Sequence, residues 1–214
     1  MTKKILITGA NGQLGHEMRN ALKGNNRFEC IFTDVAELDI CNAEAVKQII
    51  ADNHIDYIVN CAAYTQVDKA EDNAELCKKI NTDAVENLAR AAADHGARMI
   101  HISTDYVFNG RGYRPYTEDM VPDPQSVYGS TKLEGEKILT DICPESIIIR
   151  TAWLYSPYGN NFVKTMLHLG EEREELSVVA DQIGTPTCAA DLAQAILVIL
   201  QADTFVPGTY HFSD

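Results

Sequence analysis

The stretch Ile5-Leu-Ile-Thr-Gly-Ala-Asn-Gly-Gln-Leu-Gly15 decides the fold of this chain. Its apolar run leads into three glycines, and a segment of helical period follows. A buried strand that turns through glycines into a helix is typical of the first unit of a dinucleotide-binding sheet. Gly9 would permit the tight turn, Gly12 would let the backbone approach a pyrophosphate, and Gly15 would allow helix and strand to pack closely.

The backbone amides at the start of this helix, those of Gly12, Gln13 and Leu14, would meet the phosphate charge. Two residues separate the first two glycines, whereas the usual fingerprint G-x-G-x-x-G has one. An ordinary structural turn between strand and helix is therefore the alternative interpretation.

Short apolar runs alternate with segments of helical period over the first two thirds of the sequence. Such alternation requires crossover connections, which make the strands parallel and place helices on both faces. We therefore predict an α/β fold with a doubly wound, parallel Rossmann-type sheet and a partial smaller substrate-binding lobe. Strands are expected at residues 4–8, 29–33, 57–61, 99–103 and 146–150, and helices at 14–23, 43–53, about 73–95, 127–142 and about 190–201.

We expect a dinucleotide-binding domain at residues 1–150, and a partial substrate-binding region at 151–214 that is interleaved with the last sheet elements. Between them, residues 111–125 are rich in glycine, proline and acidic side chains, which predicts a long surface loop. A loop of this length in a compact domain is usually functional, and it is a candidate wall of an active site.

The 214 residues carry a formal net charge of −13, so the surface is too acidic to favour nucleic acid or an anionic membrane as a partner. Six cysteines lie far apart without a Cys-x-x-Cys pair, which predicts reduced thiols. The first four residues leave no room for a secretory signal, and no apolar stretch is long enough to span a bilayer. We expect a cytoplasmic protein.

Ligands of a doubly wound sheet bind beyond the carboxyl ends of its strands. Asp34 ends the second predicted strand, where a carboxylate accepts hydrogen bonds from an adenosine ribose. Its charge would repel a 2′-phosphate, so NADH is favoured over NADPH unless cations elsewhere compensate. Asp39 and Ile40 resemble a pair that cradles adenine, with a helix-capping region before Asn42 as an equal alternative.

Tyr128 and Lys132 stand one helical turn apart on one face of a predicted helix. A lysine ammonium stabilises a phenolate, so it would lower the pKa of Tyr128 toward the range of a general acid. Thr104 directly follows a predicted strand and would hydrogen-bond the same substrate oxygen, with Ser103 as the competing candidate. The alternatives are an exposed helix pair for Tyr128 and Lys132, and a helix cap for Thr104.

Several motifs together resemble the extended short-chain dehydrogenase/reductases, and among these the dTDP-4-dehydrorhamnose reductase family. The similarity runs from residue 4 to residue 212. The first two motifs below are more particular to these reductases, and the others are shared with epimerases and dehydratases. The motifs are Ser103-Thr-Asp-Tyr-Val-Phe108, Val67-Asp-Lys-Ala-Glu71, Thr8-Gly-x-x-Gly-x-x-Gly15, Tyr128-Gly-Ser-Thr-Lys132 and Arg150-Thr-Ala-Trp153.

The resemblance implies reduction of the C4 ketone of dTDP-4-dehydro-L-rhamnose by NADH or NADPH, in nucleotide-sugar and cell-surface polysaccharide synthesis. It implies that Tyr128 donates the proton, that Lys132 is its partner and that Thr104 tunes it. Asn81 would order its helix and a proton-relay water. Contacts to substrate are expected from Thr104, Asp105 and Trp153, with a core aromatic as the alternative for Trp153. Contacts to the cofactor are expected from Gly9, Gly12, Gln13, Leu14, Gly15, Asp34, Asp39, Ile40, Ala63, Tyr64, Thr65, Tyr128 and Lys132.

The chain departs from the family in two respects. Family members continue beyond the position of Asp214, so we expect that part of the substrate lobe lies outside this sequence. Some members bind magnesium through carboxylates, but Ala189 and Ala190 precede Asp191 here, and we predict no metal site.

Two other functions stay open at this point: another sugar-nucleotide epimerase or reductase, and a non-catalytic, dinucleotide-binding regulatory subunit. The intact set of Thr104, Tyr128 and Lys132 argues against the second, because a binding protein has no need of a tuned phenol. A dTDP-sugar is the expected small-molecule partner. The sequence leaves the oligomeric state open, and a homodimer is compatible with it.

Overall fold

The computed structural model describes residues 2–214 and contains two parallel sheets. The larger sheet has the strand order β2-β1-β3-β4-β5-β8, and every pair in it is parallel. This confirms the predicted doubly wound sheet. Its strands are β1 (Lys3–Thr8), β2 (Phe28–Thr33), β3 (Tyr57–Asn60), β4 (Arg98–Thr104), β5 (Ile147–Thr151) and β8 (Gly208–His211).

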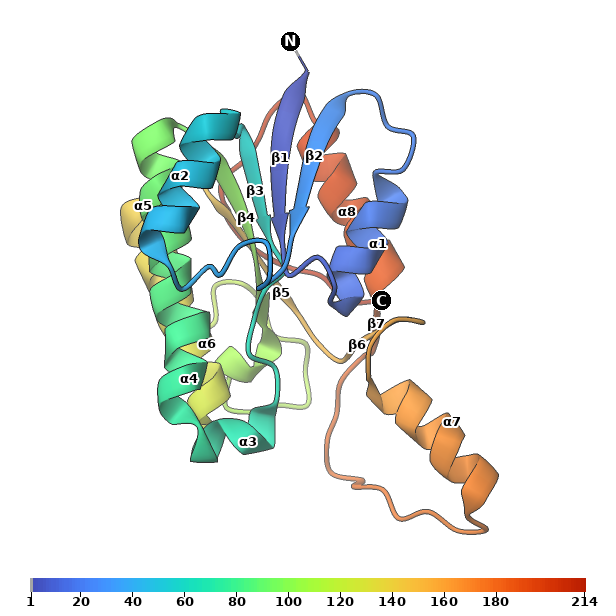
Figure 1. The fold of residues 1–214 in the computed structure, drawn as a ribbon. Helices are drawn as coiled ribbons and strands as arrows, with labels where there is room; N and C mark the ends of the chain where they lie inside the picture. Colours follow the sequence, from blue (N-terminus) through green and yellow to red (C-terminus); the bar gives the residue numbers. More distant parts are fainter. Residues whose placement is uncertain (1) are drawn as a thin grey trace.

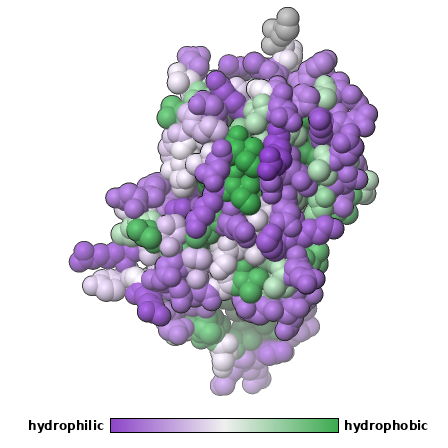
Figure 2. All heavy atoms as spheres, turned by 90° about the vertical axis from the view of Figure 1, so that its left-hand side faces the viewer, coloured by the Kyte–Doolittle hydropathy of each residue, from purple (hydrophilic) through white to green (hydrophobic). Residues whose placement is uncertain are grey.

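Helices cover both faces of this sheet (Figure 1). On one face pack α1 (Gln13–Ala21) and α8 (Ala189–Gln201), and on the other α2 (Ala43–Asn53), α5 (Ala84–His95) and α6 (Val127–Ile142). The surface that α2 and its neighbours present is mostly hydrophilic, with hydrophobic residues in small separate areas (Figure 2). The apolar side chains of these helices therefore face inward, as their helical period requires.

Successive side chains of a strand point to opposite faces of the sheet, so each strand contributes to two hydrophobic cores. Ile5, Ile7 and Val59 pack toward α1 and α8, whereas Leu6 and Ile58 pack toward α2, α5 and α6. The second set continues, at the carboxyl ends of the strands, into polar side chains that point to the same helices. A buried polar row therefore lies under α6.

Three of the remaining helices lead from β3 to α5. They are α3 (Val67–Asp72), α4 (Ala74–Lys78) and η1 (Lys79–Asp83), which is a π-helix. The predicted helix at about 73–95 is thus α4, η1 and α5 in succession, and α3 was not predicted. A short 3-10 helix, η2 (Asp105–Val107), follows β4. The predicted loop at residues 111–125 comes after it and contains neither helix nor strand.

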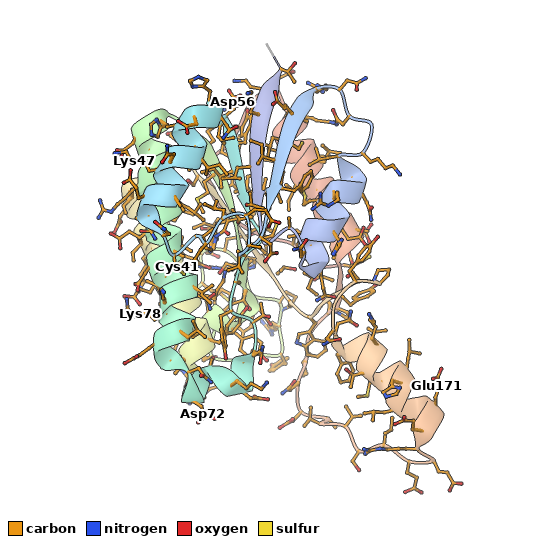
Figure 3. The ribbon with its side chains drawn as sticks, viewed as in Figure 1. Cys41, Lys47, Asp56, Asp72, Lys78 and Glu171 are labelled. Carbon is orange, nitrogen blue, oxygen red and sulfur yellow. The ribbon has the colours of Figure 1, made fainter. Side chains whose placement is uncertain are left out.

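The chain beyond β5 both leaves the sheet and returns to it. The small sheet of β6 (Leu154–Tyr155) and β7 (Thr187–Cys188) brackets α7 (Phe162–Glu172), which projects away from the main sheet and buries none of its residues. Glu171, near the end of α7, lies far from the strands in Figure 3. Because α8 and β8 then pack on the main sheet, residues 151–214 are interleaved with it, and the predicted boundary at residue 150 stays a prediction.

At the amino ends of the strands, Asp56 joins β1 to β3. Its carboxylate accepts hydrogen bonds from the ammonium of Lys3 at 2.7 Å and from the backbone amide of Lys4 at 2.8 Å. These bonds hold the pKa of Asp56 below its ordinary value although burial raises it. Asp56 lies at the end of the sheet opposite the predicted site (Figure 3). No helix in the described part of the chain is long and apolar enough to cross a membrane.

Replacing Gly135 by alanine tests how closely α6 packs on η1. A Cβ at residue 135 would lie 2.3 Å from the carbonyl oxygen of Asn81. Gly135→Ala should therefore destabilise the protein, because overpacking costs about 1–3 kcal/mol, more than the roughly 1 kcal/mol that alanine gains in a helix. Gly170→Ala is the matched control in α7, where a Cβ meets nothing within 4 Å. Urea unfolding should place the two variants on opposite sides of the wild type, and equal midpoints would contradict this packing.

Candidate functional site

The glycine turn closes against the end of β3, at the point where the chain switches from one side of β1 to the other. Gly9 has a φ of +63°, and a Cβ there would lie 2.7 Å from the backbone of Ala62. A Cβ at Gly15 would lie 2.4 Å from the carbonyl oxygen of Gly9. Both positions therefore exclude a side chain, as predicted, and the turn lies where doubly wound sheets bind nucleotides.

A cavity of about 530 Å³ lies beside this turn, a size that suits a small-molecule ligand. Six of the predicted cofactor contacts line it: Gly9, Gly12, Asp34, Asp39, Ile40 and Ala63. Cys41, which follows them and also lines the cavity, is labelled in Figure 3. The glycines Gly9 and Gly12 line this cavity with backbone alone, without a Cβ. A dinucleotide requires such a close approach to the backbone.

The carboxylate of Asp34 is already engaged by the backbone of this turn. It accepts hydrogen bonds from the amide of Asn11 at 2.9 Å and from the amide of Val35 at 2.8 Å. The carboxylate of Glu37 accepts the amide of Asp34 at 2.9 Å, which brings a second negative charge to the same place. Asp34 thus orders the glycine turn as well as facing the cavity. Asp39 does not cap α2, because its carboxylate accepts the amide of Cys41 at 2.9 Å, whereas Asn42 caps the helix by accepting the amide of Ala45 at 3.2 Å.

Gln13 and Leu14 do not line the cavity with their side chains. Leu14 is buried in the core. The amide oxygen of Gln13 accepts hydrogen bonds from Asn161 at 2.9 Å and from Ser156 at 3.3 Å, and its nitrogen donates to the carbonyl of Leu154 at 3.3 Å. The predicted phosphate contacts of these two residues are therefore left to their backbone amides.

Tyr64 and Thr65 extend this region toward α6. The side chain of Asn81, in the π-helix, accepts the backbone amide of Tyr64 at 2.9 Å and donates to its carbonyl at 3.1 Å. Tyr64 packs in the same cluster as Tyr128, and Thr65 is exposed. Asn81 thus fixes the segment after β3, and its side chain is committed to that role. π-Helical turns often occur at functional sites, and this one positions such a segment.

Tyr128 and Lys132 are both buried, with 8% and 1% of their surface exposed, which excludes the exposed helix pair. Burial raises the pKa of Tyr128 to about 12, and a hydrogen bond with Thr104 opposes this rise. Thr104 caps η2 by accepting the amide of Tyr106 at 3.1 Å, which confirms the helix cap, and its hydroxyl donates to the carboxylate of Asp105 at 3.1 Å. Its contact with a substrate oxygen stays a prediction. Ser103 is instead bound to the carboxylate of Glu136.

Lys132 does not act on Tyr128 as the sequence predicts. Its ammonium donates to the carbonyl of Ile102 at 2.6 Å and lies 3.3 Å from Nε2 of His101, so it turns toward the sheet. Burial lowers the pKa of Lys132 to about 8, and Lys132 is not among the groups that lower the pKa of Tyr128. The expected lowering of the tyrosine pKa is therefore wrong for this arrangement.

Beyond Tyr128 lies a second cavity, of about 390 Å³. Asp105 and Trp153 line it, and so does Tyr106, whose ring packs edge-on against that of Tyr128 with centroids 5.5 Å apart. Trp153 is 41% exposed, which rules out the core aromatic, and its φ of 47° lies in a region that non-glycine residues rarely adopt. Strain of this kind is usual where a side chain serves a ligand. Tyr128 itself lines neither cavity, but it packs with Tyr64, which follows Ala63 of the first cavity, and with Tyr106 of the second.

The sequence did not predict the buried polar groups under α6. Glu136 and Arg150 form a paired hydrogen bond, from Nη2 to Oε2 at 2.6 Å and from Nε to Oε1 at 3.0 Å. Tyr128, Lys132 and Glu136 are spaced by four residues, and this spacing was the signal of a continuous polar stripe. Among residues 2–214 no group of three or more His, Cys, Asp or Glu side chains is placed to hold a metal, and the absence of a metal site stays a prediction.

Comparison with known proteins agrees with this geometry. The RmlD substrate binding domain family matches residues 3–214. A dTDP-4-dehydrorhamnose reductase of Aggregatibacter actinomycetemcomitans is 44% identical over 214 residues, which cover 98% of this chain and 73% of that protein. The chain belongs to the dTDP-4-dehydrorhamnose reductase family. Within it, the chain superimposes on the Clostridium acetobutylicum structure with a TM-score of 0.94 at 50% identity, over 98% of this chain and 74% of that one.

Another structure of this reductase family, from Bacillus anthracis in complex with NADP, has a TM-score of 0.96 at 44% identity and covers 100% of this chain and 75% of that one. The fold of this dTDP-4-dehydrorhamnose reductase family member is therefore one that holds a nicotinamide dinucleotide.

Removing the buried charge of Lys132 should change how stability depends on pH. Burial lowers the pKa of Lys132 from its ordinary value of 10.5 to about 8 in the folded protein. Between these two pH values the unfolded chain holds a proton at Lys132 that the folded chain lacks, so the free energy of unfolding rises with pH over this range. The buried lysine therefore destabilises the folded protein most below pH 8. The unfolding free energy of Lys132→Met minus that of the wild type should therefore fall by about 2–3 kcal/mol between about pH 7 and about pH 10.

The control is Lys137→Met, which removes an exposed lysine from the same helix. Urea unfolding at both pH values should give a difference for Lys137→Met that is nearly constant. A constant difference for Lys132→Met as well would show that Lys132 titrates normally.

Proposed function

We propose that this protein reduces the C4 ketone of dTDP-4-dehydro-L-rhamnose to give dTDP-L-rhamnose, and that Tyr128 is the proton donor. The observation that carries the proposal is the buried Tyr128 phenol, which packs with Tyr64, next to the dinucleotide-shaped groove, and with Tyr106, which lines the second cavity together with Trp153. A nicotinamide dinucleotide supplies hydride when it is bound.

The proton comes from the protein. With its pKa at about 12, Tyr128 holds its proton at neutral pH, which is the state that a donor in a reduction needs. As hydride reaches C4, the carbonyl electron pair moves to the oxygen, and this oxygen takes the proton from the Tyr128 hydroxyl. An alkoxide is a stronger base than a phenolate, so the transfer is favourable even from a phenol of raised pKa. The phenolate then regains a proton, for which Lys132 lies one turn further along α6.

The second cavity has the lining that a deoxysugar suits. Trp153 offers an exposed ring for the apolar face of the sugar, and Asp105 offers a carboxylate to its hydroxyl groups. Burial raises the pKa of Asp105, and its hydrogen bonds with the Thr104 hydroxyl and with backbone amides oppose this rise. The hydroxyl of Thr104 donates to Asp105 at 3.1 Å and so fixes that carboxylate beside the cavity. These assignments give Thr104, Asp105 and Trp153 their roles in the proposed reaction.

Tyr128→Phe should lower kcat by roughly 10²–10⁴, the usual contribution of a general acid, because the ring stays and the proton is lost. Affinity for the cofactor should stay within about twofold, since phosphate binding rests on the glycine turn. Tyr57→Phe removes a phenol hydroxyl at the far end of the sheet and should leave kcat unchanged. Unchanged turnover in Tyr128→Phe would exclude Tyr128 as donor.

A panel of 4-keto sugar nucleotides, assayed with the wild type, separates this reductase from one that acts on another sugar. Binding of the cofactor without turnover of any sugar nucleotide in the panel would favour a regulatory subunit.

We also propose that Asp34 makes NADH the better cofactor. Asp34 and Glu37 would place two carboxylates beside a 2′-phosphate, and each repels it. Asp34→Asn keeps an oxygen for the amide of Asn11 and removes one charge. It should raise the ratio of kcat/KM for NADPH to that for NADH by roughly five- to tenfold. Asp39→Asn, at the predicted adenine side, is the control and should leave the ratio unchanged. A ratio that does not move in Asp34→Asn would mean that other groups set the preference.

A further inference from the structure

A buried row of polar side chains crosses three strands beneath α6. Thr8, Asn60 and His101 are register neighbours on β1, β3 and β4, and their side chains are 1%, 0% and 0% exposed. Buried polar groups are retained in a core when they are hydrogen-bonded, and each of these is. The proposed reaction uses none of the three directly, so the row needs a separate explanation.

The orientation of the Asn60 amide is fixed by its neighbours. Its Oδ1 accepts hydrogen bonds from the backbone amide of Ala62 at 3.2 Å and from the hydroxyl of Thr8 at 2.6 Å. A backbone N–H can only donate, so the atom that faces it must be the oxygen. The amide nitrogen of Asn60 therefore faces Nδ1 of His101, at 3.0 Å.

This contact selects one tautomer of His101. Because the Asn60 nitrogen donates, Nδ1 of the ring must accept, and the hydrogen of the neutral imidazole must lie on Nε2. Burial, with the charge of Lys132 nearby, holds the pKa of His101 well below its ordinary value, so the ring is neutral at physiological pH. The N–H of this neutral ring then points at Lys132.

Nζ of Lys132 lies 3.3 Å from Nε2 of His101 and donates to the carbonyl of Ile102 at 2.6 Å. An ammonium has three donors and no acceptor, so it meets the His101 N–H donor to donor. A neutral amine has a lone pair that accepts this N–H. The geometry therefore favours the uncharged lysine.

Other groups around Lys132 act in the opposite direction. Glu136, one turn further along α6, and Cys77 on α4 both favour the charged form. The carboxylate of Glu136 is neutralised by its paired hydrogen bonds to Arg150, which weakens its attraction for Lys132. Tyr128 is protonated and brings no charge. Of the groups that face Nζ, His101 is thus the one whose hydrogen bonding opposes the ammonium.

We propose that His101 is a positioning residue: Asn60 fixes it with its hydrogen on Nε2, and this N–H holds Lys132 as an amine that can accept and release a proton. Lys132 then gains and loses a proton within the working pH range rather than holding a permanent charge. The inference rests on the proposed function for the role of Lys132, but the tautomer and the titration of Lys132 can be measured without any substrate.

The tautomer is read by ¹⁵N NMR of histidine in the wild-type protein, where the two ring nitrogens of each tautomer have distinct shifts. The His101 signal, assigned through its bonds to the backbone, should show hydrogen on Nε2 and should not titrate across the neutral range. A signal with hydrogen on Nδ1, or a protonated ring, would overturn the proposal. This measurement needs no variant.

The lysine is read by ¹³C NMR of its Cε, assigned by the signal that Lys132→Met loses. His101→Gln replaces the N–H with an amide that can turn its oxygen to Nζ, so the midpoint of the Lys132 titration should rise by about one pH unit or more, a tenfold change in its ionisation constant. Thr8→Val is the matched control. It removes a buried bond from the same row but leaves the Ala62 amide to hold Asn60, so the midpoint should stay within about 0.3 pH units of the wild type.

Turnover gives a further readout. In His101→Gln the pH profile of kcat should move upward by the same amount as the Lys132 midpoint, whereas a purely structural defect would lower kcat at every pH alike. An unchanged Lys132 midpoint in a folded His101→Gln protein would overturn the proposal. If the Lys132 midpoint moves but no sugar nucleotide is reduced, the proposed function fails and the role of His101 toward Lys132 stands.

Discussion

The parallel register of β1, β3, β4 and β5 brings the carboxyl ends of the four strands to one edge, and the whole site depends on this alignment. The glycine turn follows β1, Asn60 belongs to β3, and His101 and Thr104 belong to β4; they come together because the hydrogen-bond ladders fix the register of these three strands. A slip of one residue in one strand would turn its polar end to the other face. Chemistry at this edge is therefore secured by backbone pairing more than by any side-chain contact.

The residues of α6 that contact this edge of the sheet all lie on one face of the helix. Three residues project from successive turns of this face. Tyr128 packs against Tyr106, Lys132 contacts His101 of β4, and Glu136 binds Arg150 of β5. Burying Glu136 and Arg150 costs desolvation, which their paired geometry offsets, and removing one partner would leave an unpaired charge. The pair fixes the depth of α6 on the sheet, which sets where the tyrosine comes to lie.

The sequence predicted the parts of this structure that carry strong periodicity. The first five strands and the helices α1, α2, α5, α6 and α8 follow from apolar spacing, and so does the doubly wound order. The strands β6, β7 and β8 were missed because two to four residues show no period, and α3 has only six residues. The eleven-residue helix α7, which buries none of its residues, was missed as well. The spacing placed Tyr128 and Lys132 on one face but left open where the lysine ammonium turns. That choice depends on His101 and the Ile102 carbonyl, residues distant in sequence that only the register brings near.

Gln13 joins the glycine turn to the segment that carries Trp153. Its side chain connects the first turn of α1 to Leu154, Ser156 and Asn161, directly after the residue that lines the sugar cavity, Trp153. These three hydrogen bonds tie the position of the first turn of α1 to that of the segment after β5. Gln13 is therefore the contact through which any coupling between ligands at the two cavities would pass, and such a coupling would be equal in both directions.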